Sequence, residues 1–241
     1  MKVRTTVSVV FFAMAAAGAL AAAAVFHEAH PNEFDPAKSA LVNAAWIDGA
    51  GCPSNAVISS DGSSTQTPYP AANCPDGDPT DSRNAGLIFI KSGPQANYAE
   101  PYAELKELKG SPISELGYDL RKPGAINLDP RGSQCSAEAP MFQLEMSDGH
   151  VYFVACTSPP PTTQAPVGLG WLRLRWGAGG EVLGYQDGAV LMPIPGTVVH
   201  AYIVFQDGQD SGPEQFGLAV IDNIDVNGVI VGKGATEADV H

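Results

Sequence analysis

The amino-acid sequence predicts an all-β protein, folded as an antiparallel β-sandwich with two local disulfides. The chain has 26 Gly and 20 Pro among its 241 residues, and they interrupt the apolar segments at short intervals. Short apolar segments between turn residues are typical of strands rather than long helices. Several of the segments also alternate apolar and polar residues with period two, which indicates half-buried strands. The four cysteines form an even set, as expected for a disulfide framework.

One segment could form either a helix or a strand. Ala99–Lys109 has Leu105 and Leu108 three residues apart, the spacing of one helix face. Gly110-Ser111-Pro112 ends the segment early, and another alternating segment follows directly. We therefore predict a strand here.

Alternation and composition predict the remaining strands. Ile113–Arg121 and Pro140–Ser147 each place three apolar side chains on one face. Asp148-Gly149 then turns the chain into Val151–Cys156, which predicts a β-hairpin. Two further segments are rich in Val and Ile, residues enriched in strands: Thr197–Phe205 and Phe216–Val226.

The first 24 residues have the order of charge and hydropathy of a signal peptide. Lys2 and Arg4 precede an apolar run from Val7 to Phe26 that becomes Ala-rich. The run is long enough for an uncleaved signal anchor, but its Ala-rich end favours cleavage near Ala24. We expect an extracellular or periplasmic protein with a signal peptide over 1–24, a linker over 25–39, a sandwich domain over 40–232 and a flexible tail over 233–241.

Charge excludes two classes of partner. The chain carries 13 basic and 26 acidic residues, a formal net charge of −13. Loss of Lys2 and Arg4 with the signal peptide leaves 11 basic residues and a net charge of −15. Nucleic acid and anionic membranes repel such a surface, so we expect neither as a partner of the cleaved protein.

The four cysteines are expected to form two disulfides, because an exported chain with an even count pairs them. Of the three possible pairings we favour Cys52–Cys74 and Cys135–Cys156, since each closes a loop of about 20 residues and stabilises by roughly 3 kcal/mol. Zinc is the alternative, but the sequence has no Cys-x-x-Cys pair or Cys/His cluster.

Two Asp-rich loops are candidates for a structural calcium site. They place carboxylates at Asp76, Asp78 and Asp81, and at Asp207 and Asp210. Calcium takes six to eight oxygen ligands, which alternate carboxylates of a turn can supply. An EF-hand is excluded because its sixth position would be Asp81 instead of Gly. Asp is also a good turn residue in its own right.

A second candidate site is the segment Trp171–Trp176. As a strand it would place Trp171, Arg173 and Arg175 on one face and apolar side chains on the other. An indole flanked by two guanidinium groups could bind a sugar ring or an acidic group. The alternative is that Trp171 is half-buried and the arginines neutralise nearby carboxylates.

The segment Gly217–Gly228 resembles the closing strand of secreted bacterial jelly-roll modules, which often carry an Asp-Asn-Ile-x-Val-Asn-Gly type segment. The likeness extends faintly to Ser114–Asp119 and to Cys135–Cys156. Such modules resemble carbohydrate-binding and concanavalin-like sandwiches, and many are uncharacterised exported proteins. The resemblance implies a jelly-roll topology, and it makes Asp222 a candidate calcium ligand.

The resulting hypothesis is an exported, non-catalytic binding module, with a polysaccharide or another cell-surface component as its partner. The alternative is a structural or assembly protein of the cell surface or an extracellular filament, which would self-assemble through exposed strand edges. A secreted enzyme ranks third, because the sequence has no Gly-x-Ser-x-Gly or Ser-x-x-Lys motif and no carboxylate spacing that assigns an acid and a base.

Overall fold

A computed structural model describes residues 26–39, 41–58, 64–65, 74, 76–92, 99–122, 135, 139–156, 159–168, 170–177, 180–206 and 216–233. Within these residues the secondary structure is entirely β, with 16 strands. The described residues form no helix that is long and apolar enough to cross a membrane. The expected signal peptide lies outside the described residues, as does the tail after Lys233.

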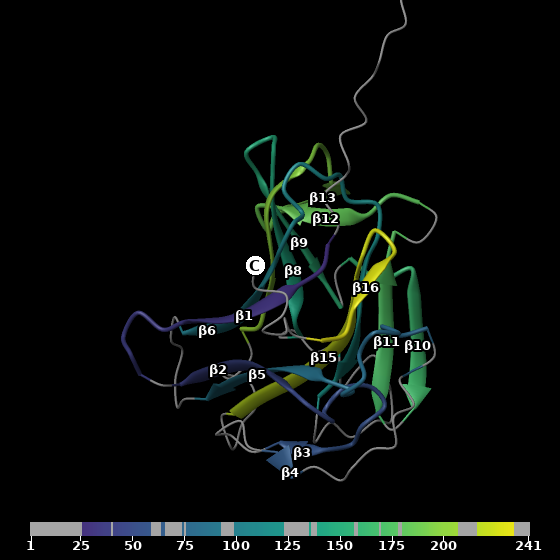
Figure 1. Cartoon of the computed structure of the whole chain (residues 1–241). Helices are drawn as coiled ribbons and strands as arrows, with labels where there is room; N and C mark the ends of the chain where they lie inside the picture. Colours follow the sequence, from purple (N-terminus) through teal and green to yellow (C-terminus); the bar gives the residue numbers. More distant parts are fainter. Residues whose placement is uncertain are drawn as a thin grey trace, which may run out of the picture.

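Two antiparallel sheets form the molecule (Figure 1). Sheet A contains, in spatial order, β1 (Ala29–Phe34), β6 (Glu100–Leu105), β14 (Val198–Val204), β8 (Met141–Met146), β9 (Val151–Ala155), β12 (Leu183–Gln186) and β13 (Val190–Pro193). Sheet B contains β10 (Thr163–Gly168), β11 (Trp171–Trp176), β7 (Leu116–Arg121), β15 (Phe216–Val226), β5 (Gly86–Ser92) and β2 (Val42–Ile47), with β16 (Val229–Val231) paired to β15. A small hairpin joins β3 (Val57–Ile58) to β4 (Ser64–Thr65).

The connectivity is that of a jelly roll, which confirms the predicted fold class. Eight strands pass from one sheet to the other, except at the β8–β9 hairpin, and give the spatial orders β6-β14-β8-β9 and β5-β15-β7-β11. Each four-strand set joins strands from both halves of the chain, as two interlocked Greek keys require. The strand predicted over Phe216–Val226 is β15, at the centre of sheet B.

The other predicted strands are also present. Ala99–Lys109 contains β6 and no helix, because its Ala103 and Leu105 are buried on one face. The hairpin at Asp148-Gly149 joins β8 to β9, and Gly149 has a φ of 86°, a conformation that suits glycine. Phe142 and Leu144 of β8 are fully buried, as their alternation predicts.

The main core lies between the two sheets. Tyr118, Phe142 and Trp176 form an aromatic group at its centre, with ring centroids 5.5–6.0 Å apart. Burial of each such side chain contributes on the order of 2 kcal/mol. The Trp176 indole donates to the carbonyl of Pro159 at 2.9 Å, so its polar atom is satisfied inside the core.

A second hydrophobic cluster covers the outer face of sheet B. Ile88, Ile90 and Val220 point outward from β5 and β15 and are buried under the segment 50–58. The Cys52–Cys74 disulfide belongs to this cluster. Sheet B is therefore buried on both faces, while the outer face of sheet A has no such cover among the described residues.

Both predicted disulfides are present. Cys52 pairs with Cys74 and Cys135 with Cys156, with Cα–Cα distances of 5.3 and 5.1 Å. These distances lie within the usual range for disulfides.

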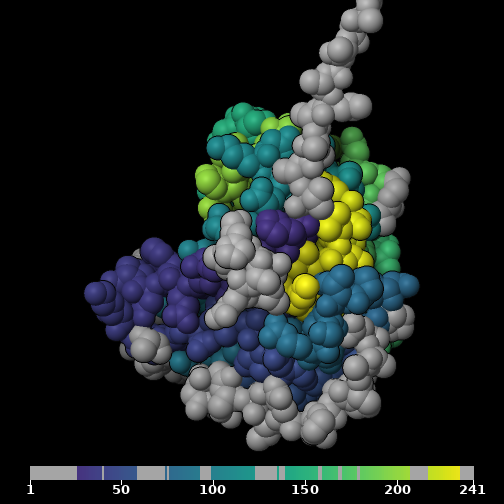
Figure 2. Space-filling model, in the orientation of Figure 1, coloured from purple at the N-terminus to yellow at the C-terminus, as the bar shows by residue number. Residues whose placement is uncertain are grey.

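The prediction of a linker over 25–39 is wrong. Ala29–Phe34 forms β1, an edge strand of sheet A paired antiparallel with β6. Phe26 and Ala29 are buried in the main core. The Trp46 indole also donates to the carbonyl of Ala29 at 2.9 Å, which ties β1 to β2 of the other sheet. The turn after Phe34 projects from the body of the molecule (Figures 1 and 2).

Candidate functional site

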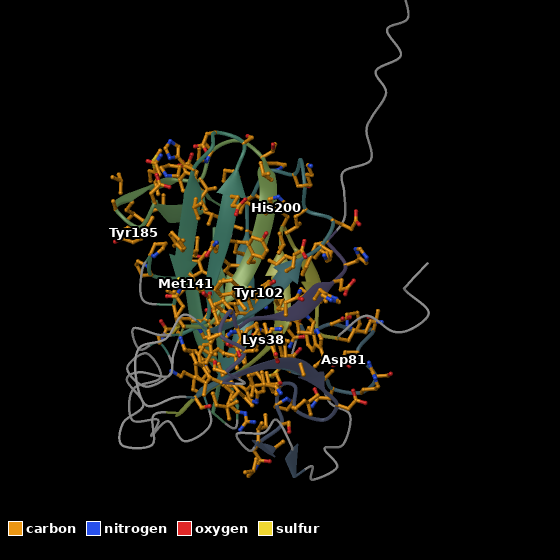
Figure 3. The ribbon with its side chains drawn as sticks, turned by 90° about the vertical axis from the view of Figure 1, so that its left-hand side faces the viewer. Lys38, Asp81, Tyr102, Met141, Tyr185 and His200 are labelled. Atoms are coloured by element: carbon orange, nitrogen blue, oxygen red, sulfur yellow. A yellow bond between two sulfur atoms is a disulfide. The ribbon has the colours of Figure 1, made fainter. Side chains whose placement is uncertain are left out.

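The open outer face of sheet A, called here the sheet A face, carries a row of polar and aromatic side chains. The row runs across five strands, each member opposite the next in the strand register: Glu104 (β6), Tyr202 (β14), Gln143 (β8), Phe153 (β9) and Tyr185 (β12). All five are only partly buried. Figure 3 looks onto this face and shows Tyr102, Met141, Tyr185 and His200 spread over it.

A hollow of about 290 Å³ lies at one end of the row. It is lined by Phe34 of β1, Glu100 and Tyr102 of β6, Gln143 and Glu145 of β8, and Tyr202 and Val204 of β14. Phe34 is 53% exposed at the rim, on the strand that precedes the projecting turn. The hollow thus combines three aromatic rings with two carboxyl groups and one amide.

Two tyrosines form the aromatic centre of the hollow. The rings of Tyr102 and Tyr202 meet edge to face, with centroids 6.0 Å apart and an interplanar angle of 76°. The ring of His200 stacks on the other side of Tyr202, 6.2 Å away at 17°. The three rings thus form one aromatic group across β6 and β14.

Acidic groups shape the electrostatics of the sheet A face. Partial burial and the charges of Glu145 and Glu104 raise the pKa of the Tyr202 hydroxyl. Burial also raises the pKa of Glu100, although a hydrogen bond with Gln206 and the charge of Lys91 oppose that shift. Glu104 forms an ion pair with Lys106.

This arrangement suits a ligand with an apolar flat side and hydroxyl groups at its edge. An aromatic ring packs against C–H groups, and tyrosine adds a hydroxyl at the ring's end. Carboxylates and the Gln143 amide accept and donate hydrogen bonds nearby. A pyranose ring has this combination of an apolar face and a polar edge.

The other sequence-predicted platform is not open. Trp171 is 1% exposed, and its indole donates to the carbonyl of Ser54 at 2.7 Å under the segment that covers sheet B. The guanidinium of Arg121 lies 5.6 Å from the ring centroid. The prediction that Trp171 offers an exposed ring for a ligand is therefore wrong, because a segment more than 100 residues away in sequence covers it.

Arg173 and Arg175 neutralise buried carboxylates, which is the alternative that the sequence left open. Arg173 donates two hydrogen bonds of 2.8 Å to the two oxygens of Asp119, which is fully buried. Arg175 lies 3.7 Å from Asp119 and 3.3 Å from Asp225. Gly117 faces Arg175 across the strands, and a Cβ there would approach the Arg175 Cδ to 2.2 Å.

The acidic loop Asp76–Asp81 comes together with Asp222, as a shared site requires. Each oxygen of Asp78, Asp81 and Asp222 already accepts a backbone N–H, from Thr80, Gly232, Arg83, Ala85, Asn223 and Cys52. Asp76 lies 4.0 Å from Arg173 and is 94% exposed at its side chain. These bonds hold the loops, and a calcium ion would have to share or displace them, so calcium binding here stays a prediction.

Asp222 sits where β15 bulges. Asn223, which follows it, has a φ of 49°. Its amide nitrogen donates to the Asp119 carboxylate at 2.9 Å, and its amide oxygen accepts the backbone N–H of Asp78 at 2.8 Å. Complete burial, with Asp119 and Asp81 nearby, raises the pKa of Asp222 well above its usual range. Asp207 and Asp210, the second predicted calcium loop, lie outside the described residues.

A larger hollow, of about 400 Å³, lies between the start of β1 and β16. Phe26, Asp78 and Val231 are among its lining residues. The Asp78 carboxylate is engaged by backbone donors, as described above. Glu28 and Lys233 also line this hollow, so it carries charges of both signs, whereas the hollow on the sheet A face combines acids with three aromatic rings.

Comparison with known proteins gives two structural similarities. The chain is similar to the family 11 carbohydrate-binding module of the cellulosomal cellulase Lic26A-Cel5E of Clostridium thermocellum, with a TM-score of 0.34 and 8% identity over 87% of this chain and 91% of that one. It is also similar to a β-1,2-glucanase from Parabacteroides distasonis, with a TM-score of 0.35 and 12% identity over 77% of this chain and 23% of the glucanase. No protein-family model and no curated protein matches the chain.

Sequence reasoning missed the sheet A face. Its signal was present: Tyr102 stands at an outward position of the alternating segment Ala99–Lys109, and Tyr202 at one of Thr197–Phe205. A large ring on the polar side of an alternating strand is a candidate binding residue. Which strands bring such rings together depends on pairing between distant segments, and alternation does not give that pairing.

Proposed function

We propose that this protein is an exported, non-catalytic binding module whose sheet A face holds a polysaccharide chain. The observation that carries the proposal is the edge-to-face pair of Tyr102 and Tyr202 in a hollow with Glu100, Glu145 and Gln143. A ring surface surrounded by hydrogen-bonding side chains is the chemistry that a sugar ring needs. Two disulfides support the exported location, since such bonds persist in oxidising compartments.

The row on the sheet A face supports an extended chain as the ligand. Tyr202 on β14 and Tyr185 on β12 are separated by three strand spacings, about 14 Å in all. The strand spacing is close to the rise per sugar of an extended β-linked hexose chain. A polysaccharide crossing the strands would thus place successive rings over successive side chains of the row.

A glycan array followed by titration calorimetry tests the proposal. We expect Tyr202→Ala and Tyr102→Ala each to weaken binding of the best glycan at least about tenfold, equivalent to about 1.4 kcal/mol. Val57→Ala is the matched control, because it shortens a side chain that is 65% exposed on the small β3–β4 hairpin. Absence of binding to any glycan, or equal affinity in the tyrosine variants, contradicts the proposal.

The non-catalytic part of the proposal has its own readout. Prolonged incubation of the protein with the bound glycan should leave the chain-length distribution unchanged on chromatography. The appearance of shorter oligosaccharides would instead make the protein an enzyme.

The alternative of an assembly protein is favoured by one observation. β13 is an edge strand of sheet A, and its Val190 and Leu191 are 55% and 43% exposed. Leu183 on the adjacent β12 is 37% exposed. An exposed apolar edge can pair with a second copy of the chain.

A further inference from the structure

We propose that the sheet A face selects polysaccharides that carry free amino groups over neutral and acidic ones. The inference rests on the proposed function, because it names the class of glycan for the same face. It follows from how charge is arranged around the paired tyrosine rings.

The hollow is acidic as well as aromatic. Glu100 and Glu145 belong to its lining, and Glu104 stands directly opposite Tyr202 in the strand register. None of the described lining residues carries a positive charge. These acids lie on β6 and β8, the strands on either side of β14, so they flank the Tyr202 ring.

These carboxylates differ in how far neighbouring groups neutralise their negative charge. Glu104 is paired with Lys106, and Glu100 has Lys91 and Gln206 as neighbours. Glu145 stands opposite His200, whose ring is stacked on Tyr202. Partial burial, and after it the charges of Glu145 and Glu104, raise the pKa of the Tyr202 hydroxyl. The ring edge therefore lies in a negative potential.

An ammonium group fits such a place better than a hydroxyl. The face of a tyrosine ring attracts a cation, and a carboxylate beside it forms a charge-assisted hydrogen bond. The C–H face of the same amino sugar can still pack on the neighbouring ring. N-acetylation removes the positive charge, and the carboxylates of a uronic acid polymer would be repelled.

Calorimetry with three oligosaccharides of equal length tests the inference: oligomers of glucosamine, of N-acetylglucosamine and of galacturonic acid. At about pH 6, where a sugar amine is largely protonated, we expect the glucosamine oligomer to bind about tenfold more tightly than its acetylated form. The preference should shrink as salt rises from about 50 to about 500 mM, because screening weakens exposed charge pairs. Galacturonic acid oligomers should not bind.

Variants locate the effect. Glu145→Gln keeps the size of the side chain and should remove most of the preference, while His200→Gln should keep it or increase it. Glu181→Gln, an exposed acid outside the hollow, is the matched control and should change nothing. Equal preference in the Glu145→Gln variant, or binding that Tyr202→Ala does not weaken, would place the ligand elsewhere on the acidic surface and overturn the inference.

The two proposals fail in different ways. Binding of neutral oligosaccharides as tightly as glucosamine oligomers overturns the selection for amino groups but keeps the polysaccharide-binding face. Absence of binding by all the glycans on the array overturns both.

Discussion

At the scale of single residues, charged side chains are buried in sheet B and aromatic side chains are exposed on sheet A. On β11, Arg173 and Arg175 form ion pairs with Asp119 and Asp225 inside the fold. On sheet A, Tyr102 and Tyr202 remain partly exposed although their rings are large. The two arginines that the sequence suggested for a ligand thus stabilise the fold, and the tyrosine rings of sheet A remain accessible.

Loss of the Asp119 carboxylate should be strongly destabilising. Asp119→Ala leaves the guanidinium of Arg173, 13% exposed at its side chain, without its two hydrogen bonds. Removal of one partner from a buried ion pair typically lowers the free energy of unfolding by about 3–5 kcal/mol. Urea denaturation of the variant and the unmodified protein measures this difference in the free energy of unfolding. As a control, Asp48→Ala breaks an exposed pair with Arg83 and should cost no more than about 1 kcal/mol.

Stability should fall as pH rises above the acidic range, owing to Asp222. Its pKa is raised in the folded state, so between the unfolded value of about 3.9 and the folded value the folded protein binds more protons. The free energy of unfolding therefore decreases with pH across that window. Asp222→Asn should flatten this dependence in urea denaturation at a series of pH values. Parallel slopes in the two proteins would show that the carboxylate is ionised in the folded state.

At the scale of elements, the segment 50–58 makes the two sheets unequal. It covers sheet B through Trp171 and is held by Cys52–Cys74. Cys52 also donates its backbone N–H to Asp222 at 2.8 Å, which ties the segment to β15. Hydrogen bonds therefore hold the cover to β11 and β15, and a disulfide holds it to Cys74.

Removal of the Cys52–Cys74 bond should loosen the cover and leave the sheet A face intact. Cys52→Ala with Cys74→Ala should lower the free energy of unfolding by about 3 kcal/mol, the value for a loop of this length. Tryptophan emission should shift to longer wavelength as Trp171 meets water, whereas glycan affinity should not change. The double variant of Cys135 and Cys156 is the control, since that bond belongs to the main core rather than to the cluster around Trp171. An unchanged spectrum would mean that the other attachments hold the cover alone.

Strands with strong local patterns could be predicted from the sequence, and β1 could not. Phe216–Val226 is rich in Val and Ile and was predicted with its observed bounds. Ala29–Phe34 (AHPNEF) has little apolar alternation and contains Pro31, so its strand depends on pairing with β6. Proline is tolerated there because β1 is an edge strand.

The candidate site was less predictable than the fold, because it is assembled over long distances. Alternation correctly separated the two faces of Trp171–Trp176 but could not show which would be covered. The cover comes from Ser54, 117 residues earlier in the sequence. The hollow likewise joins Tyr102 to Tyr202, which lie together only because of the jelly-roll crossing.

At the scale of the whole molecule, the exposed edge strand β13 bears on whether the protein is a monomer or self-associates. If the assembly alternative holds, size-exclusion chromatography with light scattering should show a mass that grows with protein concentration. Val190→Lys should abolish that growth, because a charge on an edge strand opposes pairing with another edge. Leu183→Ala, on the adjacent inner strand, should reduce it less. A monomer at every concentration contradicts the assembly alternative.

The direction of the row from Glu104 to Tyr185 has a mechanical meaning. It runs across the strands, along the line of their hydrogen bonds, and β14 stands in it between β6 and β8 although it comes much later in the chain. A polymer lying on the row would contact all five strands and so link strands from both halves of the sequence. A force that separates these strands would then first have to detach the polymer, so the protein should resist mechanical unfolding better with the polymer bound than without it.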